Sequence, residues 1–132
     1  VEHEISVVNQ HPVTAGLPAT FTMTDELYLC PIFGDSVTPL LTSNYPFTDD
    51  NFYSASQAVA GTMFSREGWS HPPGANLVGW VKHYRNSPIV YLQGGDDPTA
   101  YADENYQRLL HNAIRWVASP EAHAWARAQN KS

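Results

Sequence analysis

The last third of the chain has the most regular pattern of apolar and polar positions. Apolar residues recur there at intervals of three and four, and they are Tyr106, Leu109, Leu110, Ala113, Ile114 and Val117. This spacing predicts a helix with one apolar face. Asp103 is placed to cap its first turn. Ser119 and Pro120 end it and begin a shorter helix over residues 120–129.

The earlier part of the chain alternates with the two-residue period of β-strands. The predicted strands occupy residues 2–9, 21–30, 37–43 and 89–93. The segment 21–30 is interrupted by a kink, and 89–93 is continuously apolar, as in strands buried on both faces. The pattern predicts an α/β chain in which the C-terminal helices cover one face of a sheet, while the other face needs a partner.

Composition narrows the class of protein. A length of 132 residues with 42% hydrophobic residues indicates one soluble globular domain, and no apolar run approaches membrane-spanning length. The net charge of −6 argues against nucleic acid and anionic membranes as partners. The polar opening from Val1 is not a signal peptide, which leaves a removed upstream segment and either a cytoplasmic or an exported location open.

The sequence offers little evidence for a nucleophilic cysteine or for a metal site. Cys30 precedes Pro31, which has no backbone N–H to stabilise an oxyanion, so Cys30 is predicted to be a small buried residue. The six histidines include no pair at helical ligand spacing. His71 combined with Glu26 or Asp96 is the one weak metal candidate. No cofactor is predicted, and a divalent metal stays open.

The segment 93–98, QGGDDP, leads from an apolar strand into a helix. Its glycine turn offers backbone N–H groups to an anion, but Asp96 and Asp97 would repel a phosphate. The aspartates are better suited to sugar hydroxyls, and aromatic side chains could cover the apolar side of a sugar ring. The aromatic candidates are Tyr28, Trp69, Trp80 and Tyr101. Alternatively, Asp97 caps the turn before Pro98 and both aspartates are solvated.

Acid/base catalysis requires two carboxyl groups in one cleft whose pKa values differ. Glu26 and Asp96 each lie near the end of an apolar segment. Ligands of open α/β sheets bind at the ends of strands. We therefore predict Glu26 and Asp96 as a catalytic pair.

Several segments, in this order and spacing, resemble the C-terminal half of ThuA-like (trehalose utilisation) domains. They are HPVTAGLP, FTMTDELY, VGWVKHY and the final IVYLQGGDDPTAYADENYQRLLHNAIRWVAS. The resemblance covers nearly the whole chain. It implies a fold similar to class I glutamine amidotransferases, a flavodoxin-like α/β/α sandwich with a mainly parallel sheet. It also implies a role in the use of trehalose, related disaccharides or keto-sugars.

The resemblance also implies site residues. They are His11, Asp25, Glu26 and Tyr28 in the first segments, Trp80 in the third, and the loop 94–98 with Gly95 and Asp97. Relatives usually have a histidine where this chain has Asp96. The family's N-terminal half has no counterpart, so residues 1–132 are predicted to form a single domain lacking that half.

Three hypotheses follow, in order of preference. The first is a carbohydrate-processing or carbohydrate-binding protein with a saccharide in a cleft at the strand ends. The second is a non-catalytic module that pairs through its uncovered sheet face, either with a second copy or with the missing half. The third is a metal-dependent hydrolase that uses His71.

Overall fold

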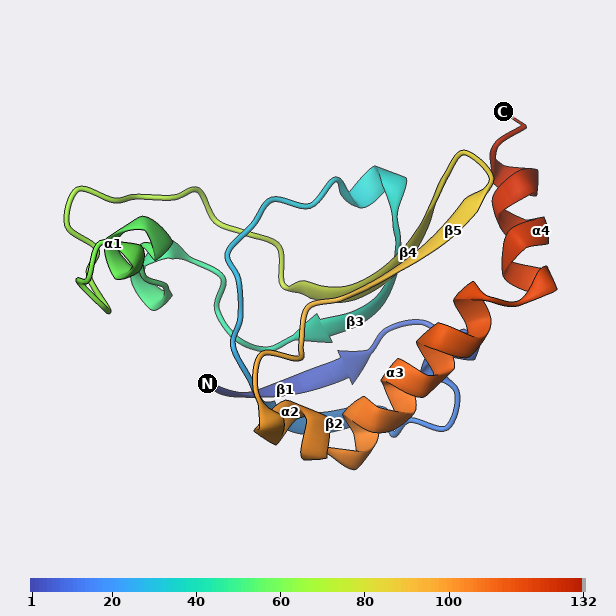
Figure 1. The fold of residues 1–132 in the computed structure, drawn as a ribbon, viewed down its shortest axis with the longest axis horizontal. Coiled ribbons are helices and arrows are strands. Elements are labelled where there is room, and N and C mark those ends of the chain that lie inside the picture. Colours follow the sequence, from blue (N-terminus) through green and yellow to red (C-terminus); the bar gives the residue numbers. More distant parts are fainter. Residues whose placement is uncertain (132) are drawn as a thin grey trace.

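A computed structural model of the chain describes residues 1–131. Its centre is a five-stranded sheet in the order β2-β1-β3-β4-β5 (Figure 1). The strands are β1 (Glu2–Val7), β2 (Thr20–Thr24), β3 (Thr38–Ser43), β4 (Leu77–Tyr84) and β5 (Ser87–Leu92). The predicted α/β class, with C-terminal helices packed on a sheet, is confirmed.

Every pair of neighbouring strands in this sheet is antiparallel. The family resemblance had implied a mainly parallel sheet. Parallel neighbours need a crossover connection, usually a helix, whereas antiparallel neighbours can be joined by a tight turn. The link between Tyr84 of β4 and Ser87 of β5 is only Arg85 and Asn86, which permits the antiparallel arrangement alone.

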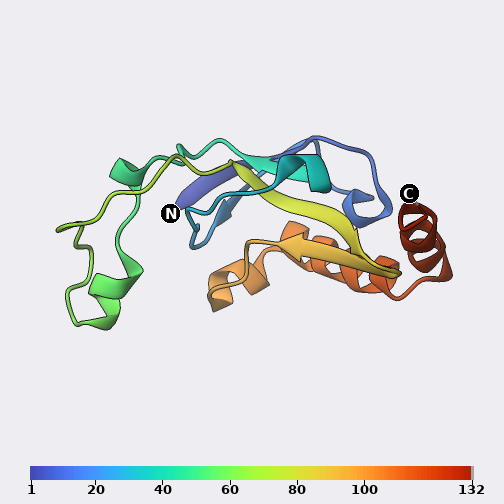
Figure 2. The same ribbon diagram turned by 90° about the horizontal axis from the view of Figure 1, so that it is seen from above.

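A short helix, α2 (Pro98–Ala102), is followed by α3 (Glu104–Val117) and α4 (Pro120–Gln129). Helices α2 and α3 lie on one side of the sheet and α4 lies at its end, as Figure 2 shows. Helix α3 packs against β5 and the turn η1 (Pro12–Thr14), and α4 packs against β4 and β5. Both predicted caps are confirmed, because Asp103 accepts a hydrogen bond from the Tyr106 N–H and Ser119 accepts one from the Ala122 N–H.

The hydrophobic core fills the space between the sheet and the helices. Strand residues Ile5, Phe21, Met23, Leu41 and Val81 pack there with the helical residues Tyr106, Leu109, Ala113, Trp116 and Ala122. Nearly all of the predicted helical stripe therefore faces the core, although Ile114 is exposed. Burial of this stripe, more than helix propensity, fixes α3 on the sheet.

The predicted return of segment 21–30 to a strand is wrong. Strand β2 ends at Thr24, and the chain then runs without regular structure to η2 (Gly34–Ser36). Leu27 is buried, as its hydrophobicity suggested. However, the N–H groups of Glu26 and Tyr28 bond to the side chains of Asp25 and Gln93, which leaves those N–H groups unavailable to a neighbouring strand.

Strand β5 is not buried on both faces as predicted, because it lies at the edge of the sheet. Ile89 is exposed, and Val90, Tyr91 and Leu92 are half-buried. On the face opposite Leu92, the Tyr91 ring stacks on Trp80 at a centroid distance of 3.8 Å. The apolar run therefore reflects packing on one face and an aromatic pair on the other.

Two further features lie outside the space between the sheet and the helices, although Phe47 and Phe52 of the first are buried. Residues 44–76 form an arm that projects beyond the sheet and contains η3 (Asp49–Asn51) and α1 (Ala55–Val59) (Figure 1). The face of β1 and β2 turned away from the helices carries exposed polar residues, namely Glu2, Glu4, Thr20, Thr22 and Thr24. Within residues 1–131, no helix has the length and apolar character needed to cross a membrane.

Candidate functional site

Two segments far apart in sequence meet beside the ends of β2 and β5. The Asp25 carboxylate accepts hydrogen bonds from the N–H groups of Gly95 at 2.7 Å and Asp96 at 3.2 Å. In the opposite direction, the Gln93 side-chain oxygen accepts a bond from the Tyr28 N–H at 3.1 Å. These bonds join residues 25–28 to residues 93–96.

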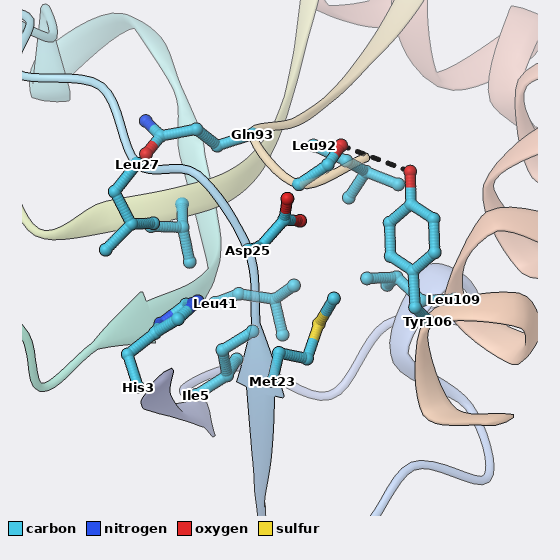
Figure 3. A pocket seen from close by; sticks show the side chains of 12 residues that line it. His3, Ile5, Met23, Asp25, Leu27, Leu41, Leu92, Gln93, Tyr106 and Leu109 are labelled. Carbon is cyan, nitrogen blue, oxygen red and sulfur yellow. Dashed lines mark hydrogen bonds between the residues drawn. The ribbon is translucent and has the colours of Figure 1, made fainter. Parts of the chain in front are cut away.

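Asp25 lies at the centre of this junction. Figure 3 shows its carboxylate above Met23, with Gln93 and Leu27 on one side and Tyr106 on the other. Its exposed fraction is 4%, and its Oδ1 atom also accepts a bond from the Glu26 N–H at 2.8 Å. The backbone N–H groups of the glycine turn therefore bind a carboxylate of the same chain, which the sequence did not predict.

Glu26 and Asp96 are brought together, as the sequence predicted. Their backbone N–H groups both bond to Asp25 Oδ1, and the Tyr28 hydroxyl donates to Glu26 Oε2 at 3.2 Å. Partial desolvation, and then the neighbouring Asp96 carboxyl group, raise the pKa of Glu26.

Gly94 and Gly95 have no room for side chains. A Cβ atom on Gly94 would lie 2.7 Å from Asp25 Oδ2, and one on Gly95 would lie 2.6 Å from the Tyr106 hydroxyl. Gly95 also has a φ of 116°, a conformation that other residues rarely adopt. The close approach of this turn to Asp25 and Tyr106 therefore depends on both glycines.

Tyr106 supports the turn from α3. Its hydroxyl donates to the Gly94 carbonyl oxygen at 3.1 Å, the bond drawn in Figure 3. Burial, followed by the neighbouring Tyr101, raises the pKa of Tyr106 to about 12, so its hydroxyl remains a donor at neutral pH. The sequence identified Tyr106 only as a core residue, because the helical stripe gives no sign of what its hydroxyl touches.

A small cavity lies below Asp25, between the sheet and α3. Its volume is about 20 Å³, which is enough for one water molecule and far too little for a sugar. His3 lines it and was not predicted as a site residue. The His3 ring bonds to the Ser43 hydroxyl at 2.8 Å, and burial lowers its pKa more than the nearby Asp25 raises it.

A larger ligand would have to contact the exposed residues above this cavity. Glu26, Tyr28, Asp96 and Tyr101 are all exposed, and we call these four residues the strand-end rim. Tyr101 belongs to it because its hydroxyl is 3.1 Å from the position of a Cβ on Gly95. The rim combines a carboxyl pair with two aromatic rings, which can bind hydroxyl groups and cover the apolar side of a small ring.

Other predicted residues lie outside the rim or make structural contacts. Asp97 accepts bonds from the Thr99 and Ala100 N–H groups as the cap of α2, which confirms the alternative of a turn cap. His11 caps η1 and contacts Trp116 near the far end of α3, about 15 Å along the helix from Tyr106. Trp80 stacks on Tyr91 and does not line the cavity.

The metal candidate His71 lies in the arm. Its backbone N–H bonds to Asp49, and its ring lies 2.6 Å from the Pro72 carbonyl oxygen. Residues 1–131 contain no group of three histidine, cysteine, aspartate or glutamate side chains arranged to hold a metal ion. Cys30 is half-buried and unpaired with another cysteine, and burial raises the pKa of its thiol.

Comparison with known proteins gives one match. Residues 1–117 match the sequence model of the ThuA family, described as trehalose utilisation. Searches of curated proteins and of solved structures found no match. The matched region contains the whole sheet, the strand-end rim, and helices α2 and α3.

Proposed function

Because the chain belongs to the ThuA family of trehalose utilisation, we propose that it binds a saccharide at the strand-end rim and transfers a proton through the Glu26 and Asp96 pair. The observation that supports this proposal is that the backbones of these two exposed residues are held by one Asp25 oxygen, with Asp96 close enough to raise the pKa of Glu26. A protonated carboxyl group can donate to a sugar oxygen, and a carboxylate can accept a proton from a hydroxyl or from a C–H group next to a carbonyl.

The arrangement of the pair favours one reaction class over another. Glycosidases hold their two carboxyl groups about 5–10 Å apart, with the scissile bond between them. The backbone N–H groups of Glu26 and Asp96 bond to one and the same Asp25 oxygen, which sets the two residues side by side and not on opposite sides of a sugar. We therefore favour an oxidised sugar, such as a keto-disaccharide, whose acidic C–H group needs a single proton acceptor, over direct hydrolysis of trehalose.

Calorimetry with trehalose and with a keto-disaccharide tests the binding step. We expect the keto-sugar to bind and Glu26→Gln to weaken binding about tenfold, the loss of one charge-assisted hydrogen bond worth about 1.5 kcal/mol. Glu67→Gln, the same change on the exposed arm, serves as the matched control and should bind normally. Absence of heat with every sugar, or equal affinity in Glu26→Gln, would contradict the proposal.

Proton transfer can be followed separately. When the keto-sugar is incubated with the protein in D₂O, the NMR signal of the C–H group beside the carbonyl should disappear faster than without protein. Glu26→Gln and Asp96→Asn should each slow this exchange. Sugar binding with no acceleration of exchange would show a binding protein and would refute the catalytic part of the proposal.

A further inference from the structure

We infer that Asp25 is a positioning residue that holds Glu26 and Asp96 beside each other, and does not itself touch a ligand. The family resemblance had placed Asp25 among substrate-binding residues. The link between this inference and catalysis rests on the proposed function. The positioning itself is argued only from the contacts that Asp25 makes.

The first observation is that a single oxygen atom joins the two rim carboxyl residues. Asp25 Oδ1 accepts from the N–H of Glu26 at 2.8 Å and from the N–H of Asp96 at 3.2 Å. Asp25 Oδ2 accepts from the N–H of Gly95 at 2.7 Å. We call these three bonds the Asp25 clamp.

The second observation is that Asp25 is inaccessible. Its exposed fraction is 4%, and both of its oxygens are engaged with backbone N–H groups. The side chains of Glu26 and Asp96 are exposed. A ligand on the strand-end rim would meet those two carboxyl groups and not the one that holds their backbones.

The third observation concerns charge. Glu26 is faced by Asp96, Asp25 and the Tyr28 hydroxyl, so three of the four titratable groups at this point are carboxyl groups. Once both rim residues ionise, they repel each other, and free loops would move them apart. Charge-assisted bonds from Asp25 to the backbones of both residues oppose that separation.

Gly94 shows how closely the clamp is fitted. A Cβ on Gly94 would lie 2.7 Å from Asp25 Oδ2, so Gly94→Ala should displace the carboxylate while keeping its charge. Asp25→Asn removes the charge and keeps the shape. The two variants disturb the same clamp in different ways, which separates a positional effect from an electrostatic one.

The test is a double-mutant cycle on the titration of Glu26, followed by carboxyl ¹³C NMR. In the wild-type background, Asp96→Asn should lower the Glu26 midpoint, because the two groups interact. In the Asp25→Asn and Gly94→Ala backgrounds, the same Asp96→Asn change should have a much smaller effect. Rescue of the full effect by Asp25→Glu is not expected, since its longer side chain cannot keep this geometry.

If Asp25 acts through charge alone, Asp96→Asn will shift the Glu26 midpoint by the same amount in all backgrounds, and the inference is overturned. Should Asp25→Asn fail to fold, Gly94→Ala alone decides the matter in the same way. The titration needs no sugar. If no sugar binds but the effect of Asp96→Asn depends on the Asp25 clamp, only the proposed function is refuted. If a sugar binds but the effect of Asp96→Asn is the same with and without the clamp, only the role of Asp25 is refuted.

Discussion

The turn at Gly95 provides a quantitative test of the site's architecture. An alanine there faces two separate costs, a backbone φ of 116° and a Cβ placed 2.6 Å from the Tyr106 hydroxyl. The backbone conformation should cost about 1–3 kcal/mol and the contact about 1 kcal/mol more, so Gly95→Ala should destabilise the fold by about 2–4 kcal/mol. Tyr106→Phe removes only the hydroxyl and its bond to the Gly94 carbonyl, at about 1 kcal/mol.

The double variant distinguishes the two costs. Without the hydroxyl the contact disappears, so Gly95→Ala with Tyr106→Phe should be less destabilised than the sum of the single variants by about 1 kcal/mol. Two other glycines serve as controls. Gly68 has a φ of 68° with no atom near its Cβ position, and Gly34 has neither a positive φ nor a near contact.

Free energies of unfolding from urea denaturation, with equal m-values, give the comparison. We expect Gly34→Ala to be nearly neutral, Gly68→Ala to cost about 1–2 kcal/mol, and Gly95→Ala to cost the most. An additive double variant would show that the Tyr106 hydroxyl does not oppose a side chain at position 95. A Gly95→Ala variant as stable as Gly34→Ala would show that the turn does not have the described conformation.

Three further predictions concern pH, a helix cap and the arm. Burial lowers the pKa of His3 and of His11 from 6.5, so the unfolded chain binds protons more readily than the folded one. The free energy of unfolding should therefore be highest above pH 6.5 and should fall as the pH drops below that value. Denaturation at several pH values should show a smaller fall in His3→Gln. Asp103→Ala should lower the free energy of unfolding by about 1 kcal/mol through loss of the α3 cap, and a neutral result would contradict the Tyr106 N–H contact. Arg66 donates to the Phe52 carbonyl oxygen at 2.7 Å and lies over the Tyr53 ring. Arg66→Met should therefore speed proteolysis within the arm while the helices stay protected in hydrogen exchange. An unchanged cleavage rate would show that these contacts do not stabilise the arm.

Local patterns were sufficient to predict the helices. The positions of α3 and α4 follow from the apolar stripe and from Asp103, Ser119 and Pro120, whose effects act within one turn of the chain. The meeting of the segments that carry Glu26 and Asp96 was also predicted, because both follow apolar segments and strand ends collect ligand-binding loops. These inferences need only short-range chemistry and one general rule of topology.

Other features depend on contacts that the sequence does not reveal. The bond between Asp25 and Gly95 joins residues 70 positions apart, and nothing near Asp25 indicates that its carboxylate will be buried. The loss of strand structure after Thr24 follows from the same contact and from Gln93. The edge position of β5 could not be deduced either. A continuous apolar run is expected both for a central strand and for an edge strand whose outer face carries a stacked aromatic ring.

If the proposed saccharide site is correct, the Asp25 clamp decides which sugars it can accept. Glycine turns before helices often bind phosphate, but here the inward N–H groups of Gly95 and Asp96 are already bonded to a carboxylate. A phosphorylated sugar would find those donors occupied and would meet two outward carboxyl groups instead. The same turn that elsewhere attracts sugar phosphates would thus exclude them here, and would leave the strand-end rim to sugars that carry no charge.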